Sequence, residues 1–220
     1  MTTRLAEAAR KVIAVELDDR LKPVLDEVLQ PYTNVWVIYQ DILTVDIPRL
    51  LKPEPYIVVA NLPYYITSAI LKHLLENEHR PGRLILTVQQ EVAERMIARP
   101  DDMSILSVSV QFFGQPKIAM RLKPSVFWPR PEVDSAVITI ETYATPPVDV
   151  PDTKSFFRVV RAGFGQKRKQ LKNALGSGLG LDSQATTDLC EQAGVDPRRR
   201  AETLSLEEWA SLTRATAQML

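Results

Sequence analysis

Hydrophobic positions in the first half of the chain alternate between two periods. Short β-branched runs predict buried strands, and these runs cover residues 11–15, 35–39, 57–60 and 84–88. Apolar residues at helical spacing lie between or after them, over residues 21–29, 68–76 and 90–98. Strands that alternate with helices predict a parallel sheet covered by helices, so the expected fold class is α/β.

The second half of the chain changes character. Residues 104–113 fit strand alternation and a buried helix equally well, so the pattern leaves both open. Residues 117–122 and 136–142 predict an antiparallel pair at the edge of the sheet, which would make the sheet mixed. Prolines then crowd residues 145–152, and helical spacing resumes beyond them. We expect one domain over 1–145 and a small helical domain over 152–220.

The length and composition of the chain indicate the size of its core and its expected cellular compartment. The chain has 220 residues, of which 45% are hydrophobic, which is enough for a sizeable core. It contains no apolar run long enough to span a membrane and no secretory signal pattern, so we expect a cytoplasmic protein. The single cysteine, Cys190, excludes an intrachain disulfide and a cysteine metal cluster. The two histidines, His73 and His79, have no partner at metal-ligand spacing, and we expect no metal site.

Net charge is zero for the whole chain but uneven along it. From Pro151 onward there are 11 Lys and Arg against 8 Asp and Glu, whereas the preceding part has 16 against 19. The difference mildly favours a polyanionic partner for the C-terminal part.

Two acidic residues stand at predicted strand ends. Glu16 ends the first strand, where a carboxylate in a doubly wound fold can accept hydrogen bonds from both ribose hydroxyls of a nucleotide-like cofactor. Asp41 follows the second strand and could accept from the exocyclic amine of an adenine ring. Either residue could equally be a solvated loop carboxylate.

The segment Asn61-Leu62-Pro63-Tyr64 directly follows the strand over 57–60, at the edge of the sheet where open α/β folds bind ligands. Asn61 offers a side-chain acceptor, Pro63 fixes the backbone, and Tyr64 offers a flat face for a base. Together they could grip an exocyclic amine. The alternative is an ordinary strand-to-helix turn in which Thr67 or Ser68 caps the next helix.

Residues 61–68, Asn61-Leu62-Pro63-Tyr64-Tyr65-Ile66-Thr67-Ser68, strongly resemble the catalytic motif of the bacterial ribosomal RNA dimethyladenosine transferase (KsgA) family. Four further blocks resemble family segments in the same order. They are 88–96 (VQQEVAERM), 126–135 (VFWPRPEVDS), 164–173 (FGQKRKQLKN) and 196–205 (DPRRRAETLS). The resemblance spans nearly the whole chain.

This resemblance implies a Rossmann-like fold and S-adenosylmethionine as cofactor. The implied reaction dimethylates N6 of two adjacent adenosines in small-subunit (16S) ribosomal RNA during ribosome biogenesis. Asn61 and the Leu62 carbonyl would hold the amine in the turn that Pro63 fixes, while Tyr64 and Phe127 would sandwich the base. Glu16 would bind the cofactor ribose, and Asp41 with the Ile42 backbone its adenine. Asn61 would also lie near the cofactor sulfur, and residues 104–113 would be a helix.

The same resemblance makes the basic residues of two C-terminal blocks candidates for RNA binding. They are Lys167, Arg168, Lys169, Lys172, Arg198, Arg199 and Arg200. The implied partner is small-subunit ribosomal RNA in a pre-30S particle. A solvated surface is the alternative for such clusters.

The sequence departs from the family at its start, because family members begin with a strand and a glycine-rich turn that face the cofactor's methionine end. Here the chain begins inside the following helix, so we expect one βα unit to be absent. We then expect unpaired edges on the strands over 11–15 and 57–60, self-association, weak cofactor binding and little activity of the chain as given. The loop over 99–104 is also shorter than in the family.

Two other functions remain as alternatives. The first is a non-catalytic RNA-binding or ribosome-assembly factor that kept the fold. The second is a methyltransferase of the erythromycin-resistance branch, which the blocks at 164–173 and 196–205 make less consistent.

Overall fold

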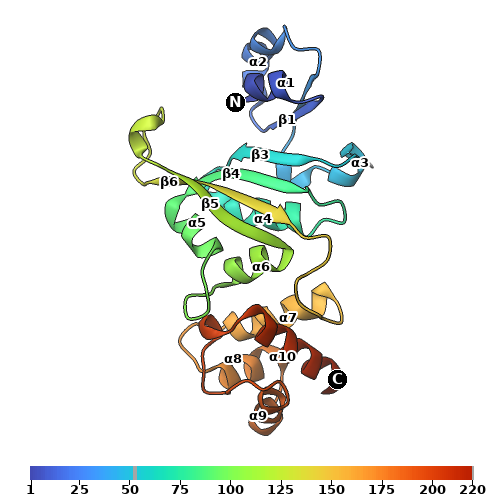
Figure 1. Cartoon of the computed structure of the whole chain (residues 1–220), viewed down its shortest axis with the longest axis vertical. Helices are drawn as coiled ribbons and strands as arrows, with labels where there is room; N and C mark the ends of the chain where they lie inside the picture. The colour runs from blue at the N-terminus through green and yellow to red at the C-terminus, as the bar shows by residue number, and fades with distance from the viewer. Residues whose placement is uncertain (52–53, 220) are drawn as a thin grey trace. The chain divides into compact units, whose positions relative to one another are not determined.

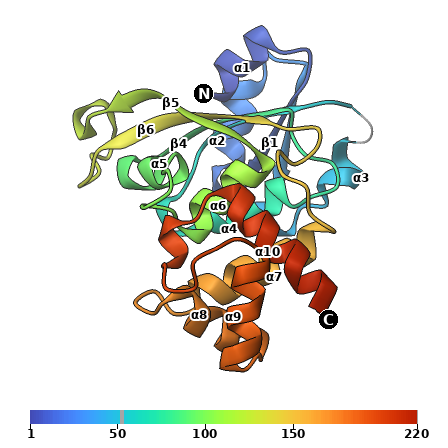
Figure 2. The same ribbon diagram turned by 60° about the horizontal axis from the view of Figure 1, so that its bottom comes forward.

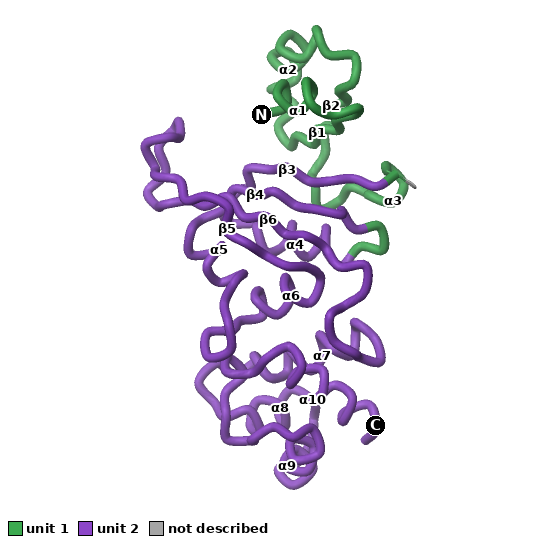
Figure 3. The backbone as a smooth tube through the Cα atoms, viewed as in Figure 1, with its two compact units in different colours: residues 1–54, 77–79 green, residues 55–76, 80–220 purple. Residues whose placement is uncertain are grey.

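The structure is a computed structural model that describes residues 1–51 and 54–219. It divides into two compact units, each built around its own sheet (Figure 3). The smaller unit comprises Met1–Glu54 with Asn77–His79, and the larger comprises Pro55–Glu76 with Arg80–Leu220.

The smaller unit is one parallel strand pair with short helices. Its elements are α1 (Thr2–Ala8), β1 (Val12–Glu16), η1 (Asp19–Leu21), α2 (Lys22–Leu29), β2 (Val35–Tyr39), η2 (Ile42–Thr44) and α3 (Ile47–Leu51). β1 and β2 pair from Val12↔Val35 to Glu16↔Tyr39. The Asn34 side chain donates to the carbonyls of Ala6 and Ala9, at 2.9 and 2.8 Å, and so fastens the end of α1 to the start of β2.

The larger unit holds a four-stranded mixed sheet. Its strands are β3 (Ile57–Asn61), β4 (Arg83–Gln89), β5 (Gly114–Leu122) and β6 (Ser135–Thr142), in the order β3-β4-β6-β5. β3 and β4 are parallel, whereas β6 runs antiparallel to β4 and to β5, which confirms the antiparallel edge pair. The helices α4 (Thr67–Leu75), α5 (Gln90–Met96) and α6 (Ile105–Phe113) cover one face of this sheet (Figures 1 and 2).

The covered face of the sheet is the centre of the core. Leu84, Leu86 and Val88 alternate along β4 and are fully buried, and the side chains between them are half-buried. Ile138 and Ile140 of β6 are also fully buried. This alternation places one face of β4 and β6 against the helices, as expected for a sheet covered on one side.

Residues 104–113, which the hydrophobic pattern left open, form helix α6 with a capping box at its start. The Ser104 side chain accepts from the Ser107 backbone N–H, and the Ser107 hydroxyl accepts from the Ser104 N–H. The Ser107 hydroxyl also donates to the Arg95 carbonyl at 2.7 Å. These caps satisfy backbone donors that a helix start would otherwise leave unpaired, and they favour helix over strand here.

The chain after residue 152 is helical, as predicted. It contains α7 (Thr153–Phe164), α8 (Leu171–Leu179), α9 (Ser183–Gln192), η5 (Ala201–Thr203) and α10 (Leu206–Met219). Phe156 of α7 stacks on Phe112 of α6, with ring centroids 4.4 Å apart, and Phe157 packs edge-on against Phe112 at 5.3 Å. This aromatic cluster joins the helices to the sheet layer in one compact unit. A separate domain over 152–220 stays a prediction.

The strands form two separate sheets, whereas the strand pattern predicted one mixed sheet. Among the described residues β1 pairs only with β2, and β3 pairs on one side only, with β4. The unpaired strand edges expected from the family resemblance are therefore present. None of the described helices is both long and apolar enough to cross a membrane.

Candidate active site

The loop Asn61-Leu62-Pro63-Tyr64 leaves the carboxyl end of β3 in the larger unit. Asn61 pairs with Thr87 in the sheet, and the Leu62 N–H donates to the Thr87 carbonyl at 3.1 Å, so the sheet fixes the loop's first peptide. The Pro63 carbonyl accepts from the Ile66 N–H at 3.2 Å, which begins η3 (Tyr64–Ile66) and then α4.

Two acceptors in this loop are free to bind a ligand. The Asn61 side chain is exposed, and no described residue forms a hydrogen bond with its amide group or donates to the Leu62 carbonyl. The Leu62 side chain is buried and anchors the turn. The loop therefore presents a side-chain oxygen and a backbone oxygen on a fixed support, as a grip on an amine requires. The turn interpretation also describes the geometry, although the Thr67 hydroxyl bonds back to the Pro63 carbonyl instead of capping α4.

A serine that the sequence did not single out orients the aromatic ring of this loop. The Tyr64 hydroxyl and the Ser135 hydroxyl are 2.8 Å apart, and Ser135 is fully buried at the start of β6. Ser135 pairs with Gln89 at the carboxyl end of β4, so the register brings β6 to the same sheet edge as the Asn61 loop. The sequence places Ser135 only at the end of the 126–135 block, and its burial, which makes the hydroxyl need a partner, is known from the structure alone.

Phe127 lies in the loop between β5 and β6, which ends at Ser135. The Phe127 N–H donates to the Pro124 carbonyl at 3.2 Å, and the ring is half-buried. Lys123 pairs with Asp134 at 2.6 Å and closes the foot of the loop, and the Gln90 N–H donates to the Asp134 carbonyl at 2.9 Å. These bonds tie the Phe127 loop to the end of β4, beside the strand that carries Asn61.

The smaller unit holds Glu16, Asp41 and Ile42 at the carboxyl ends of β1 and β2. Glu16 accepts from the Asp18 N–H at 2.9 Å through one carboxylate oxygen. Asp41 accepts from the Leu43 N–H at 2.9 Å and caps η2, again through one oxygen. All three residues are half-buried. Each carboxylate is thus oriented by a backbone bond and keeps its second oxygen for a ligand.

Comparison with known proteins gives the family. The family model described as "Ribosomal RNA adenine dimethylase" matches residues 1–218. The chain belongs to this family. A relative from Moorella thermoacetica named "Ribosomal RNA small subunit methyltransferase A" is 46% identical in an alignment 225 positions long, which covers 97% of this chain and 78% of the relative. A relative of the same name from Dehalococcoides mccartyi is 44% identical over 213 residues, covering 96% of this chain and 73% of the relative.

Solved structures agree with the adenine dimethylase fold. The crystal structure of the 23S rRNA methyltransferase ErmE matches with a TM-score of 0.74 at 26% identity, covering 99% of this chain and 86% of that one. A dimethyladenosine transferase from Plasmodium falciparum matches with a TM-score of 0.80 at 21% identity, with the same coverage, and shows the fold alone. The fold is therefore the Rossmann-like methyltransferase type that the resemblance implied.

The basic candidates of this dimethylase chain fall into two groups. Lys167, Arg168 and Lys169 are exposed in the loop between α7 and α8, and Lys172 is half-buried in the first turn of α8. None of these four side chains makes an ion pair or hydrogen bond with a described residue. Their charges are uncompensated locally.

Arg198, Arg199 and Arg200 instead pair with acidic residues of the same segment. Arg198 pairs with Asp196 at 3.0 Å and Arg200 with Glu202 at 3.8 Å. Arg199 bonds to the Glu208 carboxylate and to the Thr203 carbonyl, and it is only half-exposed. Burial opposes ionisation of Glu208, but the bonds from Arg199 and Ser205 outweigh it and hold the pKa of that carboxyl below its ordinary value. Arg199 therefore stabilises the start of α10.

Proposed function

We propose that this chain transfers methyl groups from S-adenosylmethionine to N6 of two adjacent adenosines in small-subunit ribosomal RNA. The observation that carries the proposal is the Asn61-Leu62-Pro63-Tyr64 loop at the carboxyl end of β3, in a chain that matches the adenine dimethylase model over residues 1–218. The relatives at 44% and 46% identity are named small-subunit methyltransferases.

The chain's own residues act mainly by positioning the amine. The Asn61 side-chain oxygen and the Leu62 carbonyl each accept one N–H of the adenine N6 amine, since both are free acceptors on a fixed turn. Accepting both hydrogens moves the nitrogen towards tetrahedral geometry and aims its lone pair away from the loop. Tyr64, oriented by Ser135, and Phe127 stack on the two faces of the flipped base, each worth about 1–3 kcal/mol.

The cofactor residues of the smaller unit fit an adenosine. S-adenosylmethionine supplies an electrophilic methyl group when bound. The free oxygen of Glu16 accepts from ribose hydroxyls, and the free oxygen of Asp41 accepts from the adenine amine, with the Ile42 backbone beside it. The bonds from Asp18 and Leu43 keep these carboxylates in place before the ligand arrives.

We further assign RNA contact to the uncompensated residues Lys167, Arg168, Lys169 and Lys172, in preference to Arg198–Arg200 with their acidic partners. The physiological substrate in this proposal is a pre-30S particle in the cytoplasm. The unpaired edges of β1 and β3 also support self-association through an added strand. Sedimentation over a hundredfold range of protein concentration tests that point, and a constant monomer mass contradicts it.

The test of the function is methyl transfer with two RNA substrates. The purified protein used in the test carries the family's N-terminal strand and glycine-rich turn ahead of residue 1, since weak cofactor binding is expected without them. With labelled S-adenosylmethionine and small-subunit particles that lack the modification, it is expected to yield N6,N6-dimethyladenosine at two neighbouring positions, as read by mass spectrometry of nuclease fragments. Naked large-subunit RNA is the second substrate, because ErmE is a 23S rRNA methyltransferase. Label in large-subunit RNA alone contradicts the small-subunit assignment. Binding to small-subunit particles without transfer favours the non-catalytic alternative.

A further inference from the structure

The basic residues after Pro151 are concentrated in one acid-free segment. Residues 153–181 contain seven Lys and Arg and no Asp or Glu. The seven are Lys154, Arg158, Arg161, Lys167, Arg168, Lys169 and Lys172. Lys154, Arg158 and Arg161 are spaced by four and three residues on α7, so they share one face of that helix.

Ion pairing also distinguishes this acid-free segment from the rest of the C-terminal part. None of the seven makes a side-chain ion pair among the described residues. Each of the four remaining basic residues of the C-terminal part has an acidic partner, namely Arg198, Arg199, Arg200 and Arg214. Uncompensated like charges repel one another, so a segment that keeps seven of them is suited to a polyanion.

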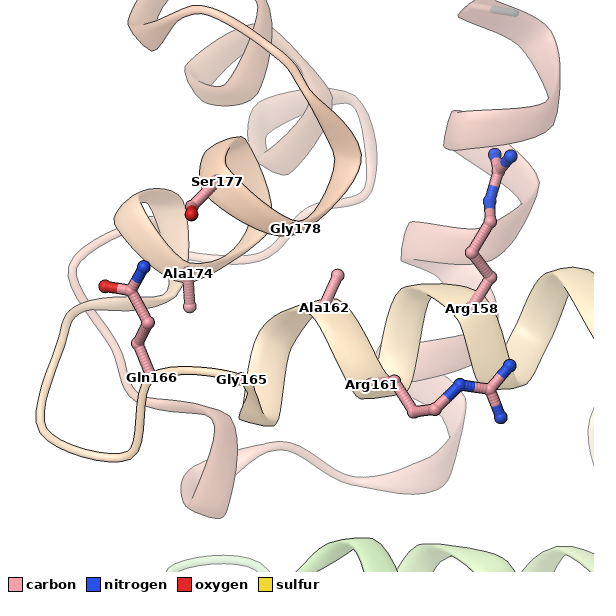
Figure 4. A pocket seen from close by; sticks show the side chains of 8 residues that line it. All are labelled: Arg158, Arg161, Ala162, Gly165, Gln166, Ala174, Ser177 and Gly178. Atoms are coloured by element: carbon pink, nitrogen blue, oxygen red, sulfur yellow. The ribbon is translucent and has the colours of Figure 1, made fainter.

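A groove of about 350 Å³ lies between α7 and α8 within this segment. Arg158 and Arg161 of α7 line it, and Gln166 and Ser177 line it towards its other end (Figure 4). Neither the Gln166 amide nor the Ser177 hydroxyl has a side-chain hydrogen bond with a described residue. The two guanidinium groups lie at one end of the groove and extend away from Gln166 and Ser177 (Figure 4), and none of the four polar groups has a side-chain hydrogen bond or ion pair with a described residue.

Small residues form the floor of the groove. A Cβ atom at Gly178 would lie 2.6 Å from the Cα of Ala162, so only glycine permits this approach of α8 to α7. Gly165 and Ala174 also line the groove and add no bulk. The lining contains no aromatic or long apolar side chain, which a protein partner would use as an anchor.

We propose that this groove binds the sugar-phosphate backbone of the RNA substrate. The inference rests on the proposed function and extends it to Arg158 and Arg161, which lie outside the family-like blocks. Arginine matches phosphate oxygens with paired donors, and the Gln166 and Ser177 groups suit ribose hydroxyls or phosphate oxygens. The loop Lys167–Lys169 follows α7 directly and continues the basic track from the groove to the RNA contacts proposed above.

The test is the salt dependence of RNA binding by the full chain. The double variant Arg158→Gln with Arg161→Gln is titrated against a labelled small-subunit RNA fragment from 50 to 300 mM KCl, by fluorescence anisotropy. Each phosphate contact contributes about 0.9 to the slope of log affinity against log salt for a duplex and about 0.7 for a single strand. We therefore expect the slope to fall by about 1.4 to 1.8. An unchanged slope overturns the proposal.

Two matched controls separate the groove from total charge. Arg198→Gln with Arg200→Gln removes the same charge from ion-paired positions in the same unit and is expected to leave the slope unchanged. An equal fall in both double variants overturns the proposal. Ser177→Glu places a carboxylate in the groove and is expected to weaken RNA binding at least about tenfold at low salt. Ser183→Glu, on the exposed first turn of α9, is the control and should not weaken it.

Methyl transfer by the N-terminally extended protein of the transfer test distinguishes failure of this inference from failure of the proposed function. With the groove in use, the Arg158 and Arg161 variant has a raised KM for RNA and an unchanged kcat, since it touches no reacting atom. If wild-type protein transfers methyl groups and the variant has wild-type KM and slope, the groove assignment is wrong and the function stands. If wild-type protein transfers none but the variant loses slope, the function is wrong and the groove still binds RNA.

Discussion

The two parallel strand pairs of this protein both end in polar side chains, but they differ in how deeply their strands are buried. β1–β2 and β3–β4 each pair over five residues and each end in polar side chains proposed to bind a ligand. β4 continues into β6 and β5, and its core face is fully buried under helices. In the β1–β2 pair, only Val12 is buried among the strand residues. The same sequence pattern, a strand followed by polar residues, thus lies on a well-packed sheet in the larger unit and on a poorly buried strand pair in the smaller unit.

The difference suggests a division of labour between the two units. Geometry that must be held within a fraction of an ångström is best placed on a packed element, whereas ground-state binding tolerates more play. Asn61 ends β3, whose own residues are half-buried or exposed but which pairs along its length with the buried strand β4, whereas Glu16 and Asp41 depend on single backbone bonds for their orientation. We expect substitutions at Asn61 to act on kcat, those in the core of the larger unit to act on global stability, and those in the smaller unit to act on cofactor affinity.

The largest expected effect is that of Asn61→Ala on methyl transfer by the N-terminally extended protein of the transfer test. Losing one of two acceptors that position the amine should lower single-turnover transfer about 1000-fold, or about 4 kcal/mol of barrier. The side chain is exposed and makes no bond to a described residue, so stability should stay unchanged. Asn173→Ala, at an exposed position in α8, is the matched control. A loss smaller than about tenfold removes Asn61 from the reaction.

Core truncation is expected to have the next largest effect and tests the unequal supports directly. Leu86 is fully buried in β4, whereas Leu29 is 8% exposed at the end of α2. Leu86→Ala should lower the free energy of unfolding by about 3 kcal/mol, in the usual range for a buried leucine. Leu29→Ala should cost about 1 kcal/mol or less, because fewer buried neighbours surround it. Equal losses in urea denaturation would contradict the comparison between the units.

The strands could be predicted from the sequence because their patterns are local. The run over 35–39 is β2 to the residue, and 57–60 lengthens only to Asn61. The helix at 104–113 could not be chosen from its pattern, since buried apolar residues fill both faces and the deciding features are the Ser104 cap and the Arg95 carbonyl. Separation of the strands into two sheets depends on which edges find partners, and no local pattern encodes that.

The candidate site shows the same division between local and distant information. Asn61, Glu16 and Asp41 could be found because strand ends are recognisable in a sequence. The partner of Tyr64 is Ser135, 71 residues away, and neither residue's own neighbourhood indicates the other. Arg198 and Arg200 pair with acids two residues away, which the sequence analysis did not predict, and the Arg199 bond to Glu208 depends on the fold of the α10 start.

A smaller effect is expected for Glu16→Gln in the smaller unit. The amide keeps the shape and one acceptor but weakens the bonds to ribose hydroxyls, so the KM for S-adenosylmethionine should rise about tenfold, or about 1.4 kcal/mol. The kcat at saturating cofactor should stay within about twofold, because no reacting atom is touched. Glu7→Gln, exposed on α1, is the control. A fall in kcat with unchanged KM would place Glu16 in the chemical step and end the proposed division of labour.

The smallest expected effect is that of Leu29→Ala on the reactivity of Cys190, which reports opening of the larger unit alone. Cys190 is fully buried in α9, and burial, helped by the nearby charges of Asp196 and Glu191, raises the pKa of the thiol from 9.0 to about 11. At pH 8 the folded thiol is mostly protonated and its side chain is fully buried, so we expect labelling to proceed through unfolding. Because the thiol pKa is higher in the folded chain, the protonated Cys190 thiol contributes stability that is fully present below pH 9 and is lost as the pH rises towards 11.

Labelling of Cys190 is therefore measured at pH 8, where Leu86→Ala should speed it about 100-fold, in line with about 3 kcal/mol of lost stability. Leu29→Ala should change it less than about twofold, because opening of the smaller unit leaves Cys190 covered. If Leu29→Ala speeds labelling as much as Leu86→Ala does, the two units unfold together, and the smaller unit is then no less stably packed than the larger.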